Sequence, residues 1–471
     1  MNNRTAWTFT ITSIALFMVT LDNLVVTTAI PVIRTHLHAS LSSLEWTVNA
    51  YTLTFAVLLL TGAALGDRFG RRRLFTLGVA IFTAGSAGAA LAPSIAMLNL
   101  ARAVQGVGGS IVLPLTLTIL SAAVPASKRG LALGAWGGIS GLAVALGPVV
   151  GGAIVQAISW QWIFWLNVPI GAALVPLART QLAETRGPAV KLDMPGLVLS
   201  AAGLFGIVWG LVRGNSSGWS SPEILTALTT GAAIIIAFVA WERHAAAPML
   251  PMRLFRNATF TLANTASLFM YFGMFGSIFL LSQFFQTVQH DSPLGSGLRI
   301  LAWTIAPMFI SPVAGALSDR LTGRTLIGTG LAMQAAGLAW LGLTTTQTTT
   351  YPAFIGPFLL AGAGMGLFFA PMANVVLSAV RPARQGQASG ANNAIRELGG
   401  VFGVAILAAV FAGRGGYISG HAFVTGMNPA LLLGAAVVAA GAAAAFAIPR
   451  GRTTAPVQAA CTEEALESVT A

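Results

Sequence analysis

Four ionisable residues lie inside long apolar stretches of the chain: Asp22, Arg102, Arg396 and Glu397. An ionisable side chain deep in a membrane costs about 3 kcal/mol or more, so it usually serves to handle protons, ions or charged solutes. Asp22 comes about fifteen residues into the first apolar stretch, which is near the middle of a bilayer at roughly 1.5 Å per residue. We expect Asp22 to bind protons or recognise cations; a structural hydrogen bond between helices is the alternative.

Arg102 shares one helical face with Gln105, Gly106 and Gly109, because spacings of three and four residues place side chains on the same side of a helix. An arginine on such a face must look into protein or water rather than lipid. We expect Arg102 to keep a nearby carboxylate ionised until a proton or a solute displaces it. The alternative is that Arg102 only braces neighbouring helices.

Two further acidic residues, Glu397 and Glu45, need an explanation. Arg396 and Glu397 are adjacent, so their side chains point about 100° apart on a helix and need not pair with each other. Glu397 is therefore the second candidate for proton coupling. Glu45 stands where the second apolar stretch begins, and we expect it to be a solvated carboxylate near a helix N-terminus.

Polar and aromatic residues on the apolar stretches are candidates to line a cavity for flat hydrophobic cations, which stack on aromatic rings. Aromatic residues of membrane helices otherwise face lipid or pack between helices. Our candidates for contacts in a substrate cavity are Asn23, Trp46, Asn49, Tyr51, Gln105, Gln283, Asn392 and Arg396.

The elements that position these residues must be membrane helices. Of the 471 residues, 55% are hydrophobic and 8% are charged, which is too apolar for one or two soluble cores. Backbone polar groups in a bilayer must be satisfied within their own segment, so the spans are helices of about 20 residues. We predict an all-α polytopic membrane protein with fourteen transmembrane helices, at 7–30, 46–65, 74–92, 97–121, 131–156, 161–178, 195–213, 224–241, 258–286, 298–317, 325–344, 352–379, 388–411 and 430–448.

The basic residues indicate how these helices are oriented. Most of the 25 Lys and Arg residues fall in loops on the side of the N-terminus, and the opposite loops hold only Arg34, Arg213, Arg299 and Arg414. By the positive-inside rule, both termini are predicted to be cytoplasmic, in a bacterial inner membrane. The net charge of +12 is then a topology signal, and we exclude nucleic acid as a partner.

Several kinds of chemistry lack the residues that they need. The two lysines, Lys128 and Lys191, follow Ser127 and Val190, so no phosphate-binding loop is present to drive transport with ATP. The run from Gly214 to Gly218 matches a nucleophile elbow only as a string, without the strand and helix that the elbow requires. Cys461 is the single cysteine. We therefore predict a protein that is not an enzyme and has no cofactor and no metal site.

The turn after the second predicted span concentrates charge in a short segment. It contains Asp67, Arg68, Gly70 and Arg71, and it resembles the signature loop of the Major Facilitator Superfamily, except that Ala63 replaces the usual glycine. A related run recurs at Asp319 and Arg320, as expected for two structural repeats. The resemblance implies that these six charged and glycine positions form a cytoplasmic gate.

Two more motifs extend the resemblance. The run around Arg102 is similar to the superfamily's pattern for a buried arginine beside proton-handling groups. Gly147, Pro148, Gly151 and Gly152 resemble the antiporter motif, which is typical of exporters, although Ala143 replaces one glycine of the full pattern. Glycine and proline there would bend the helix and let a neighbour approach closely.

Other segments resemble the fourteen-helix drug:proton antiporter family: 21–31, 46–51, 160–171, 193–196, 241–243 and 396–400, with Gln161 where relatives usually have arginine. The family implies two six-helix bundles, at 1–178 and 258–448, with inserted helices 7 and 8 at 179–257 and a cytoplasmic tail at 449–471. It implies a functional monomer in the lipid bilayer that exchanges protons for small hydrophobic or cationic compounds and exports them. The alternatives are a proton-coupled importer or facilitator of a specific metabolite, and a membrane sensor without transport activity.

Overall fold

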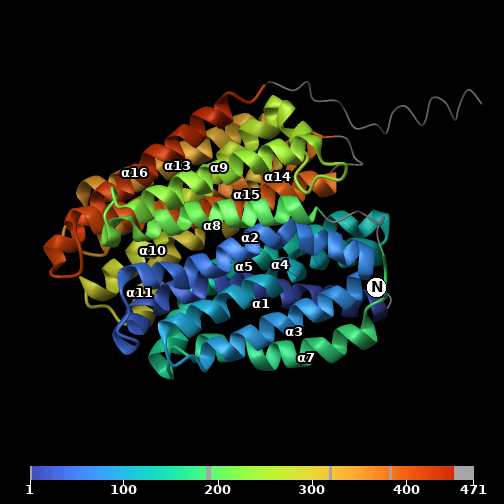
Figure 1. The fold of residues 1–471 in the computed structure, drawn as a ribbon, viewed down its shortest axis with the longest axis horizontal. Helices are drawn as coiled ribbons and strands as arrows, with labels where there is room; N and C mark the ends of the chain where they lie inside the picture. The colour runs from blue at the N-terminus through green and yellow to red at the C-terminus, as the bar shows by residue number, and fades with distance from the viewer. Residues whose placement is uncertain (1–2, 187–192, 318–320, 381–384, 450–471) are drawn as a thin grey trace, which may run out of the picture.

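The computed structural model describes residues 3–186, 193–317, 321–380 and 385–449, and this part of the chain is helical throughout (Figure 1). The α-helices and the single 3-10 helix, η1, are α1 Asn3–His36, α2 Leu41–Phe69, α3 Arg71–Ala90, α4 Ile95–Ala123, α5 Ala126–Ala157, α6 Trp162–Trp165, α7 Asn167–Gln181, α8 Met194–Ser217, α9 Pro222–His244, η1 Met252–Arg256, α10 Ala258–Thr287, α11 Pro293–Thr304, α12 Ala306–Leu317, α13 Gly323–Thr344, α14 Pro352–Ser378, α15 Gln385–Arg414 and α16 Gly420–Phe446.

The structure supports many membrane spans but does not establish the predicted number. Among the described residues, 12 helices are long and apolar enough to cross a membrane, and 13 if the bent helix α2 is one span. The predicted span 131–156 corresponds to α5, of which Ala145–Ala157 forms a shorter apolar helix. A polytopic, all-helical membrane protein is confirmed, whereas a count of fourteen is not established by these helices.

Several predicted boundaries were wrong because proline was read as a stop. Pro31 lies inside α1, which continues to His36. Pro31 leaves the carbonyl of Thr27, four residues earlier, without its helical donor, and the hydroxyl of Ser282 on α10 donates to that oxygen at 3.0 Å. A neighbouring helix thus satisfies the freed group, as membrane helices commonly arrange.

Two predicted spans are divided in the structure. The span predicted at 161–178 consists of α6 and α7, with the break at Leu166. The span predicted at 298–317 consists of α11 and α12, which meet at Ile305. The last predicted helix, 430–448, begins earlier, at Gly420, and runs through Pro429.

The helices form two groups with α8 between them (Figure 1). In the first half of the chain, α4 packs against α2 and α3, and α1 packs against α5. In the second half, α10 packs against α15 and α16, and α13 against α14 and α16. The groups meet where α1 contacts α10, α5 contacts α11 and α2 contacts α15, while α8 pairs with α9 and touches α2 and α15.

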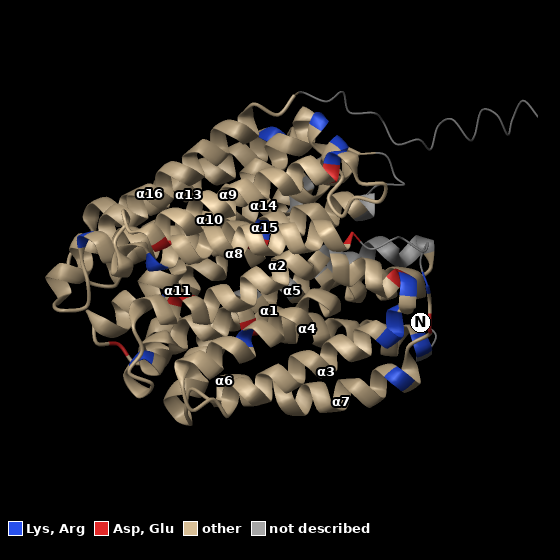
Figure 2. Ribbon diagram, viewed as in Figure 1, with Lys and Arg blue, Asp and Glu red and all other residues tan. Residues whose placement is uncertain are grey.

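Charge is distributed unevenly along this assembly. Lysine and arginine gather at the end that holds the N-terminus, and few charged residues lie along the middle of the helices (Figure 2). The middle therefore presents mostly apolar surface to its surroundings, as a bilayer requires. The charged residues that do lie there are the ones that need a structural explanation.

Candidate functional site

The central charged feature is an ion pair between Asp22 of α1 and Arg102 of α4. The Nη1 atom of Arg102 contacts the Oδ2 atom of Asp22, and the two residues are 0% and 3% exposed. Arg102 also donates from Nε to the carbonyl oxygen of Thr47 at 3.1 Å, and its guanidinium lies over the ring of Tyr51, 4.3 Å from the centroid. The predicted pairing of Arg102 with a carboxylate is present in this structure.

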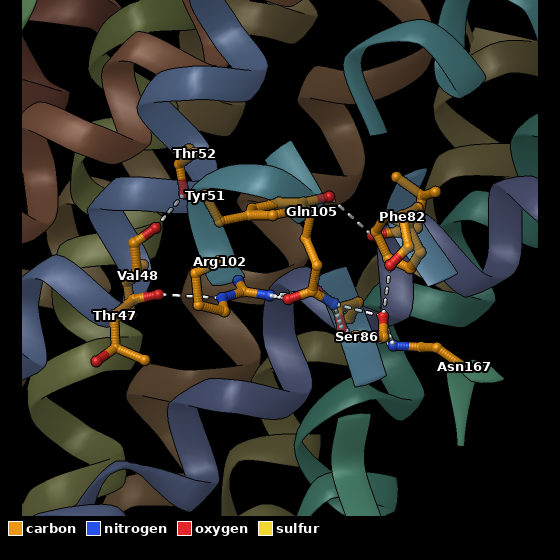
Figure 3. Close-up of polar contacts among 11 residues, drawn as sticks. Thr47, Val48, Tyr51, Thr52, Phe82, Ser86, Arg102, Gln105 and Asn167 are labelled. Atoms are coloured by element: carbon orange, nitrogen blue, oxygen red, sulfur yellow. Dashed lines mark hydrogen bonds and ion pairs between the residues drawn. The ribbon is translucent and has the colours of Figure 1, made fainter. Parts of the chain in front are cut away.

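Neutral polar groups surround this pair, and Figure 3 shows three of them, Gln105, Ser86 and Asn167, on the side of Arg102. Gln105 accepts from Arg102 at 2.9 Å and donates to Asp22 Oδ1 at 3.2 Å and to Ser86 Oγ at 2.7 Å. Asn167 donates to the same Oδ1 atom of Asp22 at 2.8 Å. Helices α1, α4 and α7 thus meet at one carboxylate, and α3 joins the network through Ser86; the charge of the carboxylate is balanced by Arg102, and its oxygens also accept from amides.

Glycines bring these helices close enough for the network to form. A Cβ atom at Gly106 would lie 2.5 Å from the carbonyl oxygen of Tyr51, and one at Gly85 would lie 2.9 Å from the backbone nitrogen of Gln105. Real side chains do not tolerate such contacts with backbone, so α2 and α3 can approach α4 only at glycine. The glycines beside Arg102 are explained by packing and not by nucleotide binding.

The second candidate acid lies on a helix of the other half of the chain. Glu397 of α15 lies against the amide of Asn23 on α1, the residue next to Asp22. Its neighbour Arg396 donates to the hydroxyl of Tyr271 and, at 3.2 Å, to Asn393, with the Tyr271 ring 4.5 Å from the guanidinium. Asp22 of α1 thus pairs with a helix of the first half of the chain, and its neighbour Asn23 contacts Glu397 of the second half.

Several buried polar atoms in this region have no protein partner among the described residues. They are the Oδ1 atom of Asn23, both side-chain atoms of Asn49, Nη2 of Arg102, Nε of Arg396 and Oε2 of Glu397. Buried polar groups are normally hydrogen-bonded. Unpaired donors and acceptors on α1, α2, α4 and α15 are suited to contact water or a polar part of a solute.

The other predicted cavity residues have partners within the protein. Asn392 donates to Asn264 and Ser267, both at 3.0 Å. Gln283 accepts from the hydroxyl of Tyr417 and donates to the Phe279 carbonyl at 3.1 Å. These contacts join helices of the second half to one another.

Trp46 is placed away from the charge pair. Its ring packs against Phe205 at 5.6 Å and Trp209 at 6.1 Å, both on α8. Tyr51, one turn further along α2, reaches Arg102 instead. The structure therefore separates two aromatic residues that the sequence grouped together.

The predicted gate loop is ordered by a residue that the sequence analysis missed. Asp67 pairs with Arg71 of the same turn at 2.8 Å, and Gly70 has a φ of 110°, a conformation that favours glycine. Glu184, beyond the end of α7, accepts from the backbone of Arg72 at 3.1 Å and lies 3.6 Å from its side chain. A Cβ atom at Gly70 would lie 2.7 Å from Glu184.

The other predicted gate residues are not part of this contact. Arg68 lies 5.3 Å from the Phe69 ring centroid, whereas Asp319 and Arg320 lie outside the described residues.

The glycines of the antiporter-like motif face two helices. A Cβ atom at Gly147 would lie 2.6 Å from Leu24 Cβ, and one at Gly151 would lie 2.6 Å from the Val25 carbonyl, so both face α1. Gly152 faces Pro293 of α11, and Gly297 of α11 faces Pro148 in return. This reciprocal crossing joins the two halves of the chain at the end away from the N-terminus.

Glu45 was predicted to be solvated, and that prediction was wrong. The residue is 2% exposed, and its Oε2 atom has no partner among the described residues. It lies in the second turn of α2, near Tyr417, whose ring is 3.5 Å from the guanidinium carbon of Arg34. Tyr417 lies between α15 and α16, and its burial raises the pKa of its hydroxyl group.

Sequence reasoning also missed Ser86 and Asn167. Both are buried polar residues, at 0% and 2% exposure, on helices that carry few other polar side chains. A search for uncharged polar residues on apolar helices would have found them. Asn167 reaches Asp22 directly and Ser86 reaches it through Gln105 and Asn167, and both depend on the packing of α3 and α7 against α1 and α4, which the local sequence does not encode.

These helices define a multi-pass membrane protein with the fold of a small-molecule transporter. The chain belongs to the Major Facilitator Superfamily, which it matches over residues 12–404. The fold is similar to that of the nucleoside transporter NupG, with a TM-score of 0.64 and 12% identity over 95% of this chain and 100% of that chain. It is also similar to the xylose transporter XylE from E. coli, with a TM-score of 0.63 and 14% identity over 96% and 100% of the two chains.

Relatives with named activities are similar over most of their length. The multidrug resistance protein Stp of Mycobacterium tuberculosis is 34% identical over 88% of this chain and 77% of its own. The tetracenomycin C resistance and export protein of Streptomyces glaucescens is 31% identical over 86% and 75%. The cephamycin export protein CmcT of Amycolatopsis lactamdurans is 36% identical over 84% and 82%.

Proposed function

We propose that this protein is a proton-coupled antiporter that exports small hydrophobic or cationic compounds. The observation that carries the proposal is the buried pair of Asp22 and Arg102, which lies within the membrane helices and has a carboxylate that a proton would neutralise. The relatives named for multidrug resistance and for antibiotic export support the export direction and the substrate class.

Proton binding at Asp22 would change the forces that hold four helices together. When Asp22 is ionised, its carboxylate accepts hydrogen bonds from Arg102, Gln105 and Asn167. Protonation removes the negative charge and leaves Arg102 without a counter-ion, which is costly in a buried site. The protein then favours another arrangement of these helices, and this shift links proton binding to alternating access.

Glu397 supplies a second carboxylate on the path of a substrate. It lies beside Asn23, the neighbour of Asp22 on α1, whose Oδ1 atom has no partner among the described residues. A cationic substrate that binds there is attracted by either carboxylate when it is ionised. Proton and substrate then compete for the same carboxylates, so the protein carries one of them only after the other has dissociated.

The crossing of α5 and α11 supports a state that is closed at one end. Gly152 and Gly297 seal the end away from the N-terminus, and the basic end holds the loop of Asp67 and Arg71. In our proposal both termini are cytoplasmic, the membrane is the inner membrane, and the structure is closed to the outside. A potential of 100 mV contributes about 2.3 kcal/mol per proton, and one pH unit about 1.4 kcal/mol, which suffices for appreciable accumulation outside.

The finer architecture also belongs to this proposal. Counting α2 and α5 as one span each gives fourteen spans, in bundles at 1–178 and 258–448 with an inserted pair at 179–257, and the chain works as a monomer. The inserted pair corresponds to α8 and α9, which contact each other closely and reach the bundles through α2 and α15.

Transport assays in cells and in proteoliposomes test the function. Cells that express the protein should export a panel of dyes and antibiotics, and a protonophore should abolish this efflux. In proteoliposomes, an imposed pH gradient should drive substrate movement against its own gradient. Proton-driven uptake of a single metabolite, with no export of any panel compound, would replace the proposal with the importer alternative.

A further inference from the structure

The cytoplasmic end of the inserted helix pair contains a basic cavity that the transport mechanism does not use. The cavity has a volume of about 1030 Å³ and lies between the end of α9, the following loop, η1 and α15. Arg243, His244, Arg253 and Arg256 line it, and all four are exposed. None of the three arginines has an ion-pair partner among the described residues, so their charge is available to an anion.

One acidic residue also lines this cavity, but it is buried and one of its oxygens is engaged by the backbone. Glu242 is 2% exposed, and its Oε2 atom accepts from the backbone nitrogen of Leu250 at 3.1 Å. Three arginines therefore face one buried carboxylate, and the cavity keeps a positive balance even with His244 neutral. An anionic group fits this balance, whereas a cationic substrate does not.

A second cavity, of about 330 Å³, lies next to the first and is lined almost entirely by apolar side chains. Its walls come from α2, α8, α9 and α15, and include Val57, Leu204, Val239 and Leu398. Ser200 is the single polar residue among the lining residues, and its hydroxyl donates to the Leu197 carbonyl at 3.0 Å. This cavity suits a hydrocarbon chain.

The two cavities share Met252 and Phe255 of η1. The basic and apolar cavities thus adjoin at one short helix, η1, which follows α9. Trp241, 41% exposed and bonded to Asp193 at 2.7 Å, lies beside them, as expected for a residue at the membrane surface. Basic pockets at this depth bind the headgroups of anionic lipids.

From this arrangement we infer that an anionic phospholipid binds between the inserted helix pair and the bundles, with its phosphate in the basic cavity and an acyl chain in the apolar one. The site is distinct from the Asp22 network and does not depend on the direction of transport. A bound lipid would fix the position of α8 and α9 relative to α2 and α15.

Native mass spectrometry of the full-length protein in detergent tests the headgroup contacts. Phosphatidylglycerol should be retained more strongly than phosphatidylcholine with the same acyl chains. The double variant Arg253→Gln/Arg256→Gln should bind phosphatidylglycerol about thirtyfold more weakly, since each basic residue near the surface contributes about fivefold. The control, Arg179→Gln/Arg186→Gln, removes two exposed arginines outside the cavity and should bind as the parent does.

Two further arms test the acyl chain and the source of the phosphate. Val239→Trp should fill the apolar cavity and weaken binding of a long-chain phosphatidylglycerol, whereas Ile236→Trp, on the lipid-facing side of the same helix, should not. Inorganic phosphate at millimolar concentration should not displace the lipid. Equal binding by Arg253→Gln/Arg256→Gln and the parent, or equal retention of phosphatidylcholine, would overturn the proposal. Displacement by inorganic phosphate together with no effect of Val239→Trp would show a free-anion site instead.

Discussion

The Nδ2 atom of Asn167 lies 2.8 Å from the Oδ1 atom of Asp22, so a residue at the start of α7 donates to the carboxylate in the middle of α1. The contact spans 145 positions in the chain and is buried. It shows that the charge of Asp22 is held by neutral donors as well as by Arg102. Transport models that consider only the ion pair therefore leave out part of the force that orients the carboxylate.

Replacement of Asn167 by leucine should weaken the network without removing either charge. Asp22 Oδ1 then keeps only Gln105, at 3.2 Å, and an underpaired buried carboxylate costs about 1–3 kcal/mol. We expect Asn167→Leu to unfold at lower temperature in detergent and to move fewer protons per substrate. Asn99→Leu is the control, because Asn99 binds Ser43 and Thr47 and does not touch Asp22. Equal uncoupling in both variants would assign Asn167 a structural role only.

Asp22→Asn should abolish proton-driven efflux, because the amide mimics a permanently protonated carboxyl group. Cationic substrates should bind more weakly than neutral ones in the variant. The change leaves Arg102 buried without a counter-ion, which costs about 3–5 kcal/mol. The double variant Asp22→Asn/Arg102→Gln removes both charges, so it should recover stability but remain uncoupled. Export of cations by Asp22→Asn at the parental rate would move the coupling role to Glu397.

Arg102→Ala should uncouple transport from the proton gradient, and Arg102→Lys should restore it only in part. A lysine keeps the charge but loses the planar fork that reaches Asp22, Gln105 and the Thr47 carbonyl together. The measurement is the substrate gradient that a fixed pH gradient supports in proteoliposomes. Identical gradients in the parent and both variants would favour a bracing role for Arg102.

The sequence was informative about the charged residues and less so about their partners. Asp22 and Arg102 stand out because a bilayer penalises charge, and the glycines at 147–152 predicted the close approach of neighbouring helices. Ser86 and Asn167 carry no charge, and only the tertiary packing of α3 and α7 brings Asn167 to Asp22 and Ser86 to Gln105. Pro31 was misread as the end of a helix. The carbonyl that the proline frees accepts a hydrogen bond from Ser282, which is more than 250 positions away in the chain.

The loop between α2 and α3 should respond more to Glu184 than to Asp67. Asp67 and Arg71 form a partly buried pair four residues apart, and helix pairs at this spacing contribute about 0.3–0.5 kcal/mol, whereas Glu184 links the loop to the segment after α7. We expect Asp67→Asn to slow turnover with little change in substrate affinity, and Glu184→Gln to slow it further. Transport rates at saturating substrate, with binding measured separately, compare the two. Parental rates in both variants at normal expression would remove the loop from the transport cycle.

The crossing of α5 and α11 should control which end of the protein opens. Gly152 faces the backbone of Pro293, so the methyl group of Gly152→Ala would push the two halves apart where the structure is closed. Overpacking of this kind costs about 1–3 kcal/mol, and a bias of that size changes the ratio of two conformations by about five- to 150-fold. Gly138→Ala is the matched control on the same helix, since a Cβ atom there meets nothing within 4 Å.

A cysteine introduced at Gln286, after Cys461 is replaced, reports opening because Gln286 donates to the Thr28 carbonyl at 2.8 Å across the closed interface. Labelling of that cysteine from outside should rise in Gly152→Ala and stay at the parental level in Gly138→Ala. The same labelling rate in both variants would mean that the glycine crossing does not set the conformational equilibrium.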